Sequence, residues 1–73
     1  MKLPLLSGKE LVRILNKFGF EALRQKGSHV FLKHPDGRIT VVPVHANQDI
    51  GRGLLRRILN DTDITPEDLV KHR

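Results

Sequence analysis

The sequence predicts an α+β fold in which helices pack on one face of a three-stranded antiparallel sheet. Three observations predict it. An amphipathic helical pattern opens the chain, three segments rich in β-branched and aromatic residues follow, and a second helical pattern with a short helical tail closes it. The expected order is α-β-β-β-α. With 73 residues, the chain has room for one domain, residues 1–73.

The first helix is expected over residues 8–18. Ser7 and Glu10 have the spacing of a capping box, in which each side chain bonds to the backbone of the other residue. An apolar stripe follows at helical spacing, formed by Leu11, Ile14, Leu15 and Phe18. Gly19 then suits the left-handed conformation that ends many helices.

Three strands are expected, over residues 20–25, 29–34 and 39–44. Lys26-Gly27-Ser28 separates the first two strands as a turn. Pro35-Asp36-Gly37-Arg38 is a hairpin signal between the second and third, because Asp-Gly tolerates positive φ. Pro43 cannot donate a hydrogen bond to a sheet, so the third strand is expected at an edge.

Centring the second loop on Asp36-Gly37 predicts which residues face the helices. The predicted pairs are His29 with Val44, Phe31 with Val42, and Lys33 with Thr40, and cross-strand partners share a face. The other face carries Val30, Leu32, His34, Ile39, Val41 and Pro43. We assign this more apolar face to the helices, which leaves the side of His29, Phe31 and Lys33 open. His45 would lie opposite Ser28, at the same end as His29, and the sequence leaves open whether the two rings point to one face.

A polar loop over residues 46–51 precedes the second helix, expected roughly over 52–60. Its apolar positions are Leu54, Leu55, Ile58 and Leu59. Thr65-Pro66 then starts a short helix near 66–71, with an N-cap threonine and proline at the first position.

Composition excludes several classes of protein. The chain has no cysteine, which excludes disulfides, thiolate metal sites and a cysteine nucleophile. No apolar run approaches the roughly 20 residues of a membrane span, and the N-terminus lacks a signal-peptide pattern. We expect a cytoplasmic protein that uses neither a membrane nor a small-molecule cofactor. His29, His34, His45 and His72 lack ligand spacing with carboxylates, so we expect no metal.

The charge distribution favours a polyanionic partner. Residues 1–58 hold eleven Lys and Arg against four acids, a net charge of +7, whereas residues 59–73 have a net charge of −2. Nucleic acid is the commonest partner for such a basic body. The alternative is a surface charge that only maintains solubility.

One segment could carry chemistry: Lys26-Gly27-Ser28-His29. Metal-free cleavage of RNA needs a base for the 2′-hydroxyl, an acid for the 5′-oxygen and cations for the phosphorane charge. Imidazole exchanges protons near neutral pH. Lys26, Lys33 and the amides of Gly27 and Ser28 could hold the phosphate. The alternative is a surface histidine at the start of a strand.

Two basic clusters could hold an RNA backbone. Lys9, Arg13 and Lys17 form one ridge at four-residue spacing, opposite the apolar stripe. Arg52, Arg56 and Arg57 crowd the start of the second helix, where free amides also favour anions. Phe31 could stack on an unpaired base. The alternatives are solvated helix faces and ordinary partial burial of Phe31.

Several motifs together have the order and spacing of one known family. They are Gly27-Ser28-His29, His34-Pro35-Asp36-Gly37-Arg38, Val42-Pro43-Val44-His45 and Gly53-Leu54-Leu55-Arg56-Arg57-Ile58-Leu59, between an opening helix that ends in Phe18-Gly19-Phe20 and a closing Ile64-Thr65-Pro66-Glu67-Asp68-Leu69. Over residues 7–69 the chain resembles the HicA (YcfA-like) mRNA-interferase toxin family.

This resemblance implies a fold like that of double-stranded-RNA-binding domains. It also implies a toxin of a type II toxin–antitoxin pair that cleaves mRNA without a metal and is bound by a HicB antitoxin. The family's catalytic histidine corresponds to His29. His45 also matches the family pattern, with no role assigned. Many members have a second histidine directly after the first, where this chain has Val30.

The sequence thus favours a metal-independent mRNA endoribonuclease that uses His29. Two alternatives stay open: an RNA-binding module without catalysis, and an inactive relative that only binds an antitoxin. In the nuclease hypothesis, Lys26, Ser28 and Lys33 steady the scissile phosphate. The basic clusters then hold the RNA backbone with little reading of bases, as A-form grooves allow.

Overall fold

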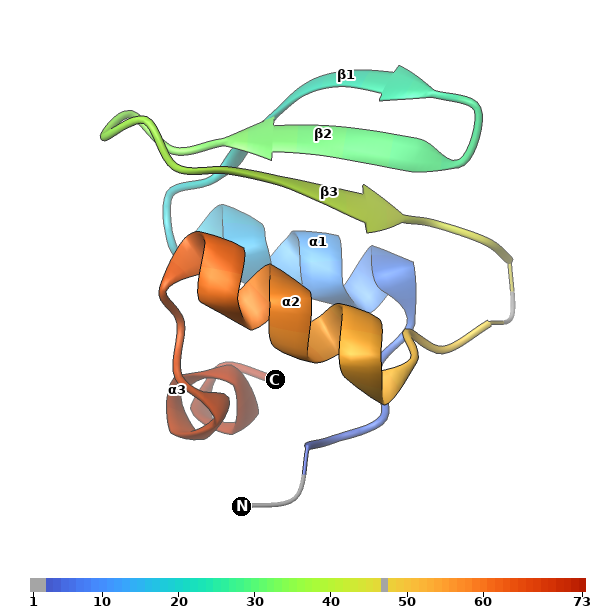
Figure 1. Cartoon of the computed structure of the whole chain (residues 1–73), viewed down its shortest axis with the longest axis vertical. Helices are drawn as coiled ribbons and strands as arrows, with labels where there is room; N and C mark the ends of the chain where they lie inside the picture. Colours follow the sequence, from blue (N-terminus) through green and yellow to red (C-terminus); the bar gives the residue numbers. More distant parts are fainter. Residues whose placement is uncertain (1–2, 47) are drawn as a thin grey trace.

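The computed structural model describes residues 3–46 and 48–73, and it has the predicted α-β-β-β-α order of a double-stranded-RNA-binding-domain-like fold (Figure 1). The elements are α1 (Gly8–Lys17), β1 (Glu21–Lys26), β2 (His29–Lys33), β3 (Ile39–Pro43), α2 (Arg52–Thr62) and α3 (Pro66–Lys71). No helix within the described ranges is long and apolar enough to cross a bilayer. Of the expected polar loop over 46–51, Asn47 lies outside the described residues.

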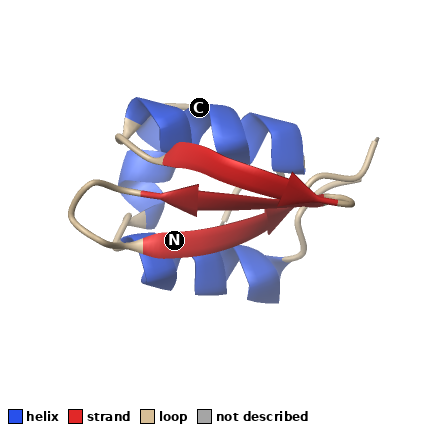
Figure 2. Ribbon diagram, turned by 90° about the horizontal axis from the view of Figure 1, so that it is seen from above, coloured by secondary structure: helices blue, strands red, loops and turns tan. Residues whose placement is uncertain are grey.

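The molecule has a sheet layer over a helix layer. Figure 2 shows the three strands in front of the helices, so one face of the sheet is covered and the other is open. The strand order is β1-β2-β3 with antiparallel pairing, which confirms that β3, the strand that ends at Pro43, lies at an edge. In Figure 1, β3 lies nearest to α1 and α2, and β1 lies farthest from them. Every residue of β1 is accordingly exposed.

The core lies between the sheet and the helices. The stripe of α1 supplies Leu11, Ile14 and Leu15, and α2 supplies Leu55, Ile58 and Leu59, all of them buried. Both helices were predicted on this pattern. Burial of such side chains is the main stabilising term of a small domain, at about 1.5–3 kcal/mol for each large aliphatic group.

The ends of the helices follow their capping chemistry. In the capping box of α1, the Glu10 amide donates to Ser7 Oγ at 3.1 Å, and the Ser7 amide donates to the Glu10 carboxylate at 3.3 Å. Helix α2 runs two residues past the predicted end, and its last residue, Thr62, donates its hydroxyl to the Ile58 carbonyl at 2.8 Å. Asp63 then ends the helix in the left-handed conformation, with φ 56°.

The register between β2 and β3 differs from the prediction by one residue. His29 pairs with Pro43 and Lys33 with Ile39, rather than with Val44 and Thr40. The predicted faces are therefore right for β2, where Val30 and Leu32 are buried. They are wrong for β3, where Thr40 and Val42 are buried and Ile39 and Val41 lie toward the open side.

The cause of the shift is the loop, which has five residues, 34–38, instead of an even number. His34 and Arg38 close this loop, because the His34 amide donates to the Arg38 carbonyl at 2.9 Å. An odd loop moves the pairing by one position and exchanges the two faces of one strand. Burial of the Thr40 hydroxyl is compatible with this register because it donates to Asp61 Oδ2 at 3.2 Å.

The same loop ties the hairpin to α2. The Arg38 side chain donates to both carboxylate oxygens of Asp36, at 3.1 and 2.9 Å, and to the Thr62 carbonyl at the end of α2. Its guanidinium also lies over the buried ring of Phe20, 5.1 Å from the ring centroid. His34 packs edge-on against the same ring at 5.2 Å. This histidine and this arginine therefore belong to the scaffold.

A close backbone contact fixes α1 against the end of β3. A Cβ atom on Gly8 would collide with the carbonyl oxygen of Pro43. Glycine at this position lets the start of α1 reach the backbone at which the chain leaves the sheet. The segment before α1 is also tied down, because the Ile50 amide donates to the Leu6 carbonyl at 2.7 Å.

We expect Gly8→Ala to lower the free energy of unfolding by about 1–3 kcal/mol, the usual cost of overpacking. Gly53→Ala is the matched control, since nothing lies within 4 Å of a Cβ there. Gly53 lies in the first turn of α2, so alanine should leave stability unchanged or raise it by up to about 1 kcal/mol. Urea titration of the two variants measures both values. Equal stability of the two would refute the backbone contact.

The Asp36–Arg38 pair should make part of the free energy of unfolding depend on pH. The hydrogen bonds from Arg38 hold the pKa of Asp36 below its usual value of 3.8. A lowered folded-state pKa gives stability that is present above the unfolded value and is lost as pH falls through the folded value. Wild type should therefore exceed Asp36→Asn in stability at neutral pH, and the difference should shrink as the pH falls below 3.8 and through the lowered folded-state pKa of Asp36. Urea titrations across this range measure it, and a constant difference would contradict the role of the charge.

Candidate functional site

A two-residue turn positions His29 at one end of the sheet. Lys26 pairs directly with His29 across the turn made by Gly27 and Ser28. Gly27 has φ 59°, which glycine adopts without strain. The Gln25 side-chain amide donates to the Gly27 carbonyl at 3.0 Å and braces the turn. Lys26 and His29 therefore occupy one exposed end of the β1–β2 hairpin.

His29 projects from the open side of the sheet. Its neighbour Val30 points into the core, so side chains alternate along β2 and those of His29, Phe31 and Lys33 lie away from the helices, as predicted. The imidazole of His29 is exposed. A polynucleotide can therefore reach this ring without any rearrangement of the core.

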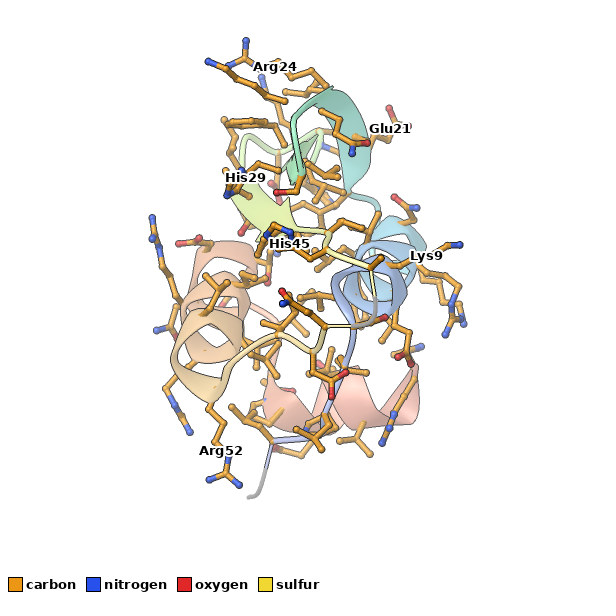
Figure 3. The ribbon with its side chains drawn as sticks, turned by 90° about the vertical axis from the view of Figure 1, so that its right-hand side faces the viewer. Lys9, Glu21, Arg24, His29, His45 and Arg52 are labelled. Atoms are coloured by element: carbon orange, nitrogen blue, oxygen red, sulfur yellow. The ribbon has the colours of Figure 1, made fainter. Side chains whose placement is uncertain are left out.

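His45 lies at the same end of the molecule. Val44, rather than His45, lies opposite Ser28, and its amide donates to the Ser28 carbonyl at 2.6 Å. The His45 ring nevertheless reaches the turn, because its Nε2 lies 3.3 Å from Ser28 Oγ. Figure 3 shows His29 and His45 on the same side of the molecule. The structure thus brings two imidazoles and one hydroxyl to one exposed end.

A groove starts at His29 and runs between the outer edge of β3 and α2. Its volume is about 390 Å³. Arg57 of α2 lines it together with His29, so one of the three predicted arginines shares a concavity with the histidine. A smaller groove of about 160 Å³ lies beside His45, and the two grooves share Pro43 and Leu54.

Phe31 lies next to His29 on the open face but has a cationic neighbour. The guanidinium of Arg24 lies over the Phe31 ring at 4.8 Å from its centroid. The ring is half-buried. Arg24 was not among the predicted site residues. The two-residue turn of Gly27 and Ser28 pairs Arg24 with Phe31, whereas the predicted turn, which included Lys26, would pair Leu23 with Phe31.

Other predicted residues lie farther from His29. Lys33 lies at the opposite end of β2, four residues or roughly 13 Å along the strand. Figure 3 shows Lys9 and Arg52 pointing away from the two histidines, Lys9 from α1 and Arg52 from the start of α2. Arg13, Lys17 and Arg56 are exposed on the same two helices. Lys9 and Arg52 therefore do not share a patch with the two histidines.

The chemistry available at this end is proton transfer and anion binding. Two histidines, a serine hydroxyl, Lys26 and the nearby Arg57 are the functional groups. Among residues 3–46 and 48–73, no three side chains of the types that bind metals come together. Asp61, which sequence analysis did not select, also lines the groove at His29.

Comparison with known proteins identifies the family. The sequence profile described as HicA toxin of bacterial toxin–antitoxin matches residues 8–64. The chain belongs to the HicA toxin family. A search of curated proteins gave no match. Membership makes the chain a toxin-type protein of a toxin–antitoxin system, and such a system implies an antitoxin partner. The matched region includes both histidines, the groove and the loop that ties the hairpin to α2.

Proposed function

We propose that this HicA-family toxin is a metal-independent endoribonuclease that cuts mRNA in the cytoplasm and is held inactive by a HicB-type antitoxin. The observation that carries the proposal is the exposed imidazole of His29, beside Lys26 and close to Ser28 and His45. Membership in a toxin family supports it. So does the excess of cations, thirteen Lys and Arg against eight acids, because polyanionic substrates favour basic surfaces.

The reaction that fits these groups is transesterification within the RNA chain. The 2′-hydroxyl oxygen attacks the adjacent phosphorus and loses its proton to a base, and a 2′,3′-cyclic phosphate forms. The bond from phosphorus to the 5′-oxygen breaks, and that oxygen takes a proton from an acid. His29 serves as one of these two groups. His45 is the second imidazole at this end, and its contact with Ser28 Oγ at 3.3 Å supports it as the other group.

The surrounding groups stabilise the charge of the phosphorane. Lys26 pairs with His29 across the turn, so its ammonium group is available to the same phosphate. The amides of Gly27 and Ser28 and the Ser28 hydroxyl offer hydrogen-bond donors. Preformed donors of this kind contribute strongly in acyl and phosphoryl chemistry, since they need no reorganisation during the reaction.

The remaining cations hold the RNA backbone away from the cut. Lys9, Arg13 and Lys17 on α1 and Arg52 and Arg56 on α2 are exposed and contact phosphates with little dependence on sequence. Lys33 binds the strand farther along the open face. Phe31, stacked under Arg24, offers a flat surface to an unpaired base.

The antitoxin blocks this site directly. The groups proposed to act on the scissile phosphate, with the cations Lys26 and Arg57 beside them, lie at one end of the molecule, around the turn and the adjoining grooves. A HicB-type partner with acidic or apolar groups can cover this end and compete with RNA for the same cations. Inhibition then requires no change in the fold of the toxin.

We expect His29→Gln to lower the rate of mRNA cleavage by at least about 100-fold, because a general acid or base contributes roughly 10²–10⁴-fold. Glutamine keeps a polar side chain of similar length but neither takes up nor releases a proton near neutral pH. The assay incubates purified protein with mRNA in EDTA and follows the fragments. His72→Gln, at the residue that follows α3, is the control and should cut as wild type does.

RNA binding by the His29→Gln variant distinguishes the nuclease hypothesis from that of a non-catalytic RNA-binding module. Fluorescence anisotropy should give the same affinity for wild type and variant, and expression of the variant should no longer arrest growth. Cleavage that persists in the variant would remove His29 from the mechanism. Absence of cleavage by wild type, with RNA binding intact, would favour the RNA-binding module.

A further inference from the structure

The groove that starts at His29 has a mixed lining that RNA backbone binding does not explain. Ile39, Val41 and Leu54 form apolar walls, and Ile39 is 52% exposed. Arg57 and Asp61 of α2 add one positive and one negative group. A carboxylate repels phosphate, so Asp61 adds nothing to the binding of an RNA backbone in this groove.

Asp61 is oriented by the scaffold. The Thr40 hydroxyl, which is buried in β3, donates to Asp61 Oδ2 at 3.2 Å. An ionised carboxylate has about four acceptor positions and no donor. One position is occupied by Thr40, and because Asp61 is exposed, the others are open to a ligand that donates hydrogen bonds.

A nucleotide matches this combination of groups. Its phosphate suits Arg57, its flat base suits the apolar walls, and an exocyclic amino group on the base suits Asp61. Adenine, cytosine and guanine carry such a group, and uracil carries none. The volume of about 390 Å³ lies in the range of small-molecule sites.

We propose that this groove is a base-binding subsite next to the scissile bond, in which Asp61 selects an amino-bearing base over uracil. The proposal rests on the proposed nuclease function, because His29 at the groove end would then act on the nucleotide beside it. Arg57, one helical turn before Asp61, holds the phosphate of the same nucleotide. The antitoxin is the other macromolecule that could fill the groove, and the binding of mononucleotides distinguishes the two occupants.

The specificity of cleavage tests the role of Asp61. Wild type, Asp61→Asn and Asp63→Asn are incubated with random-sequence RNA, and the ends of the fragments are sequenced. We expect wild type to disfavour uracil by about tenfold at one position next to the cut, since a good base contact is worth about that factor. Asp61→Asn should lose most of this preference, because its amide adds a donor facing the amino group.

Asp63→Asn is the matched control. It removes the same charge two residues away, and asparagine tolerates the left-handed conformation of this helix end. The general gain in RNA affinity from one lost negative charge should be equal in the two variants. Asp61→Asn retains a side-chain oxygen that can accept from Thr40, and thermal unfolding checks that both variants are folded. An unchanged base preference in Asp61→Asn would overturn the proposal while leaving the nuclease intact.

Binding of mononucleotides tests the subsite without any cleavage. In ¹⁵N–¹H NMR spectra, adenosine 3′-monophosphate should shift the amides of Ile39, Leu54 and Asp61 more than uridine 3′-monophosphate does. The difference should disappear in Asp61→Asn and persist in Asp63→Asn. Equal shifts with both nucleotides would refute base selection even if the protein cuts RNA. No shift in the groove with either nucleotide would overturn the subsite and favour the antitoxin as its occupant.

Discussion

The pairing of β2 with β3 is the constraint on which the rest of the molecule depends. Its register buries Val30, Leu32, Thr40 and Val42 and leaves His29 on the open side beside Pro43. A shift by one residue would bring the opposite set of side chains of one strand to the core. The bond from the Val44 amide to the Ser28 carbonyl continues this pairing one step past the sheet and so brings His45 to Ser28. The candidate site is therefore a direct product of the register.

Two parts of the scaffold maintain that register from outside the sheet. At one end of β3, the loop of residues 34–38 is fixed to α2 through Arg38 and covers Phe20. At the other end, Gly8 lets α1 contact the backbone at Pro43. Histidine and arginine are common in active sites, but His34 and Arg38 of this chain pack on Phe20 and stabilise the fold. The groups available for proton transfer and phosphate binding are the exposed ones around the turn of Gly27 and Ser28.

The sequence predicted the elements well because helical spacing, capping residues and turn glycines act locally. The capping box at Ser7 and the edge position of Pro43 were both deducible, as was the open side of β2. The faces of β3 were not, because they depend on the number of residues in a loop that the chain closes through long-range contacts. Asp61 was missed for a similar reason, since only the packing of α2 beside β3 brings it to the groove. The turn residues made His29 a candidate, and the family resemblance then favoured a catalytic role for it over that of a surface histidine.

The most direct test of the proposed mechanism is the chemistry of the RNA ends that the protein produces. Mass spectrometry of the fragments from a defined RNA, cut in EDTA, identifies the group on each end. Attack by the 2′-hydroxyl, with His29 as the base or the acid, predicts a 2′,3′-cyclic phosphate on the upstream fragment and a 5′-hydroxyl on the downstream one. A 3′-hydroxyl with a 5′-phosphate would contradict the account, because it would mean that water, and not the 2′-hydroxyl, attacks the phosphorus.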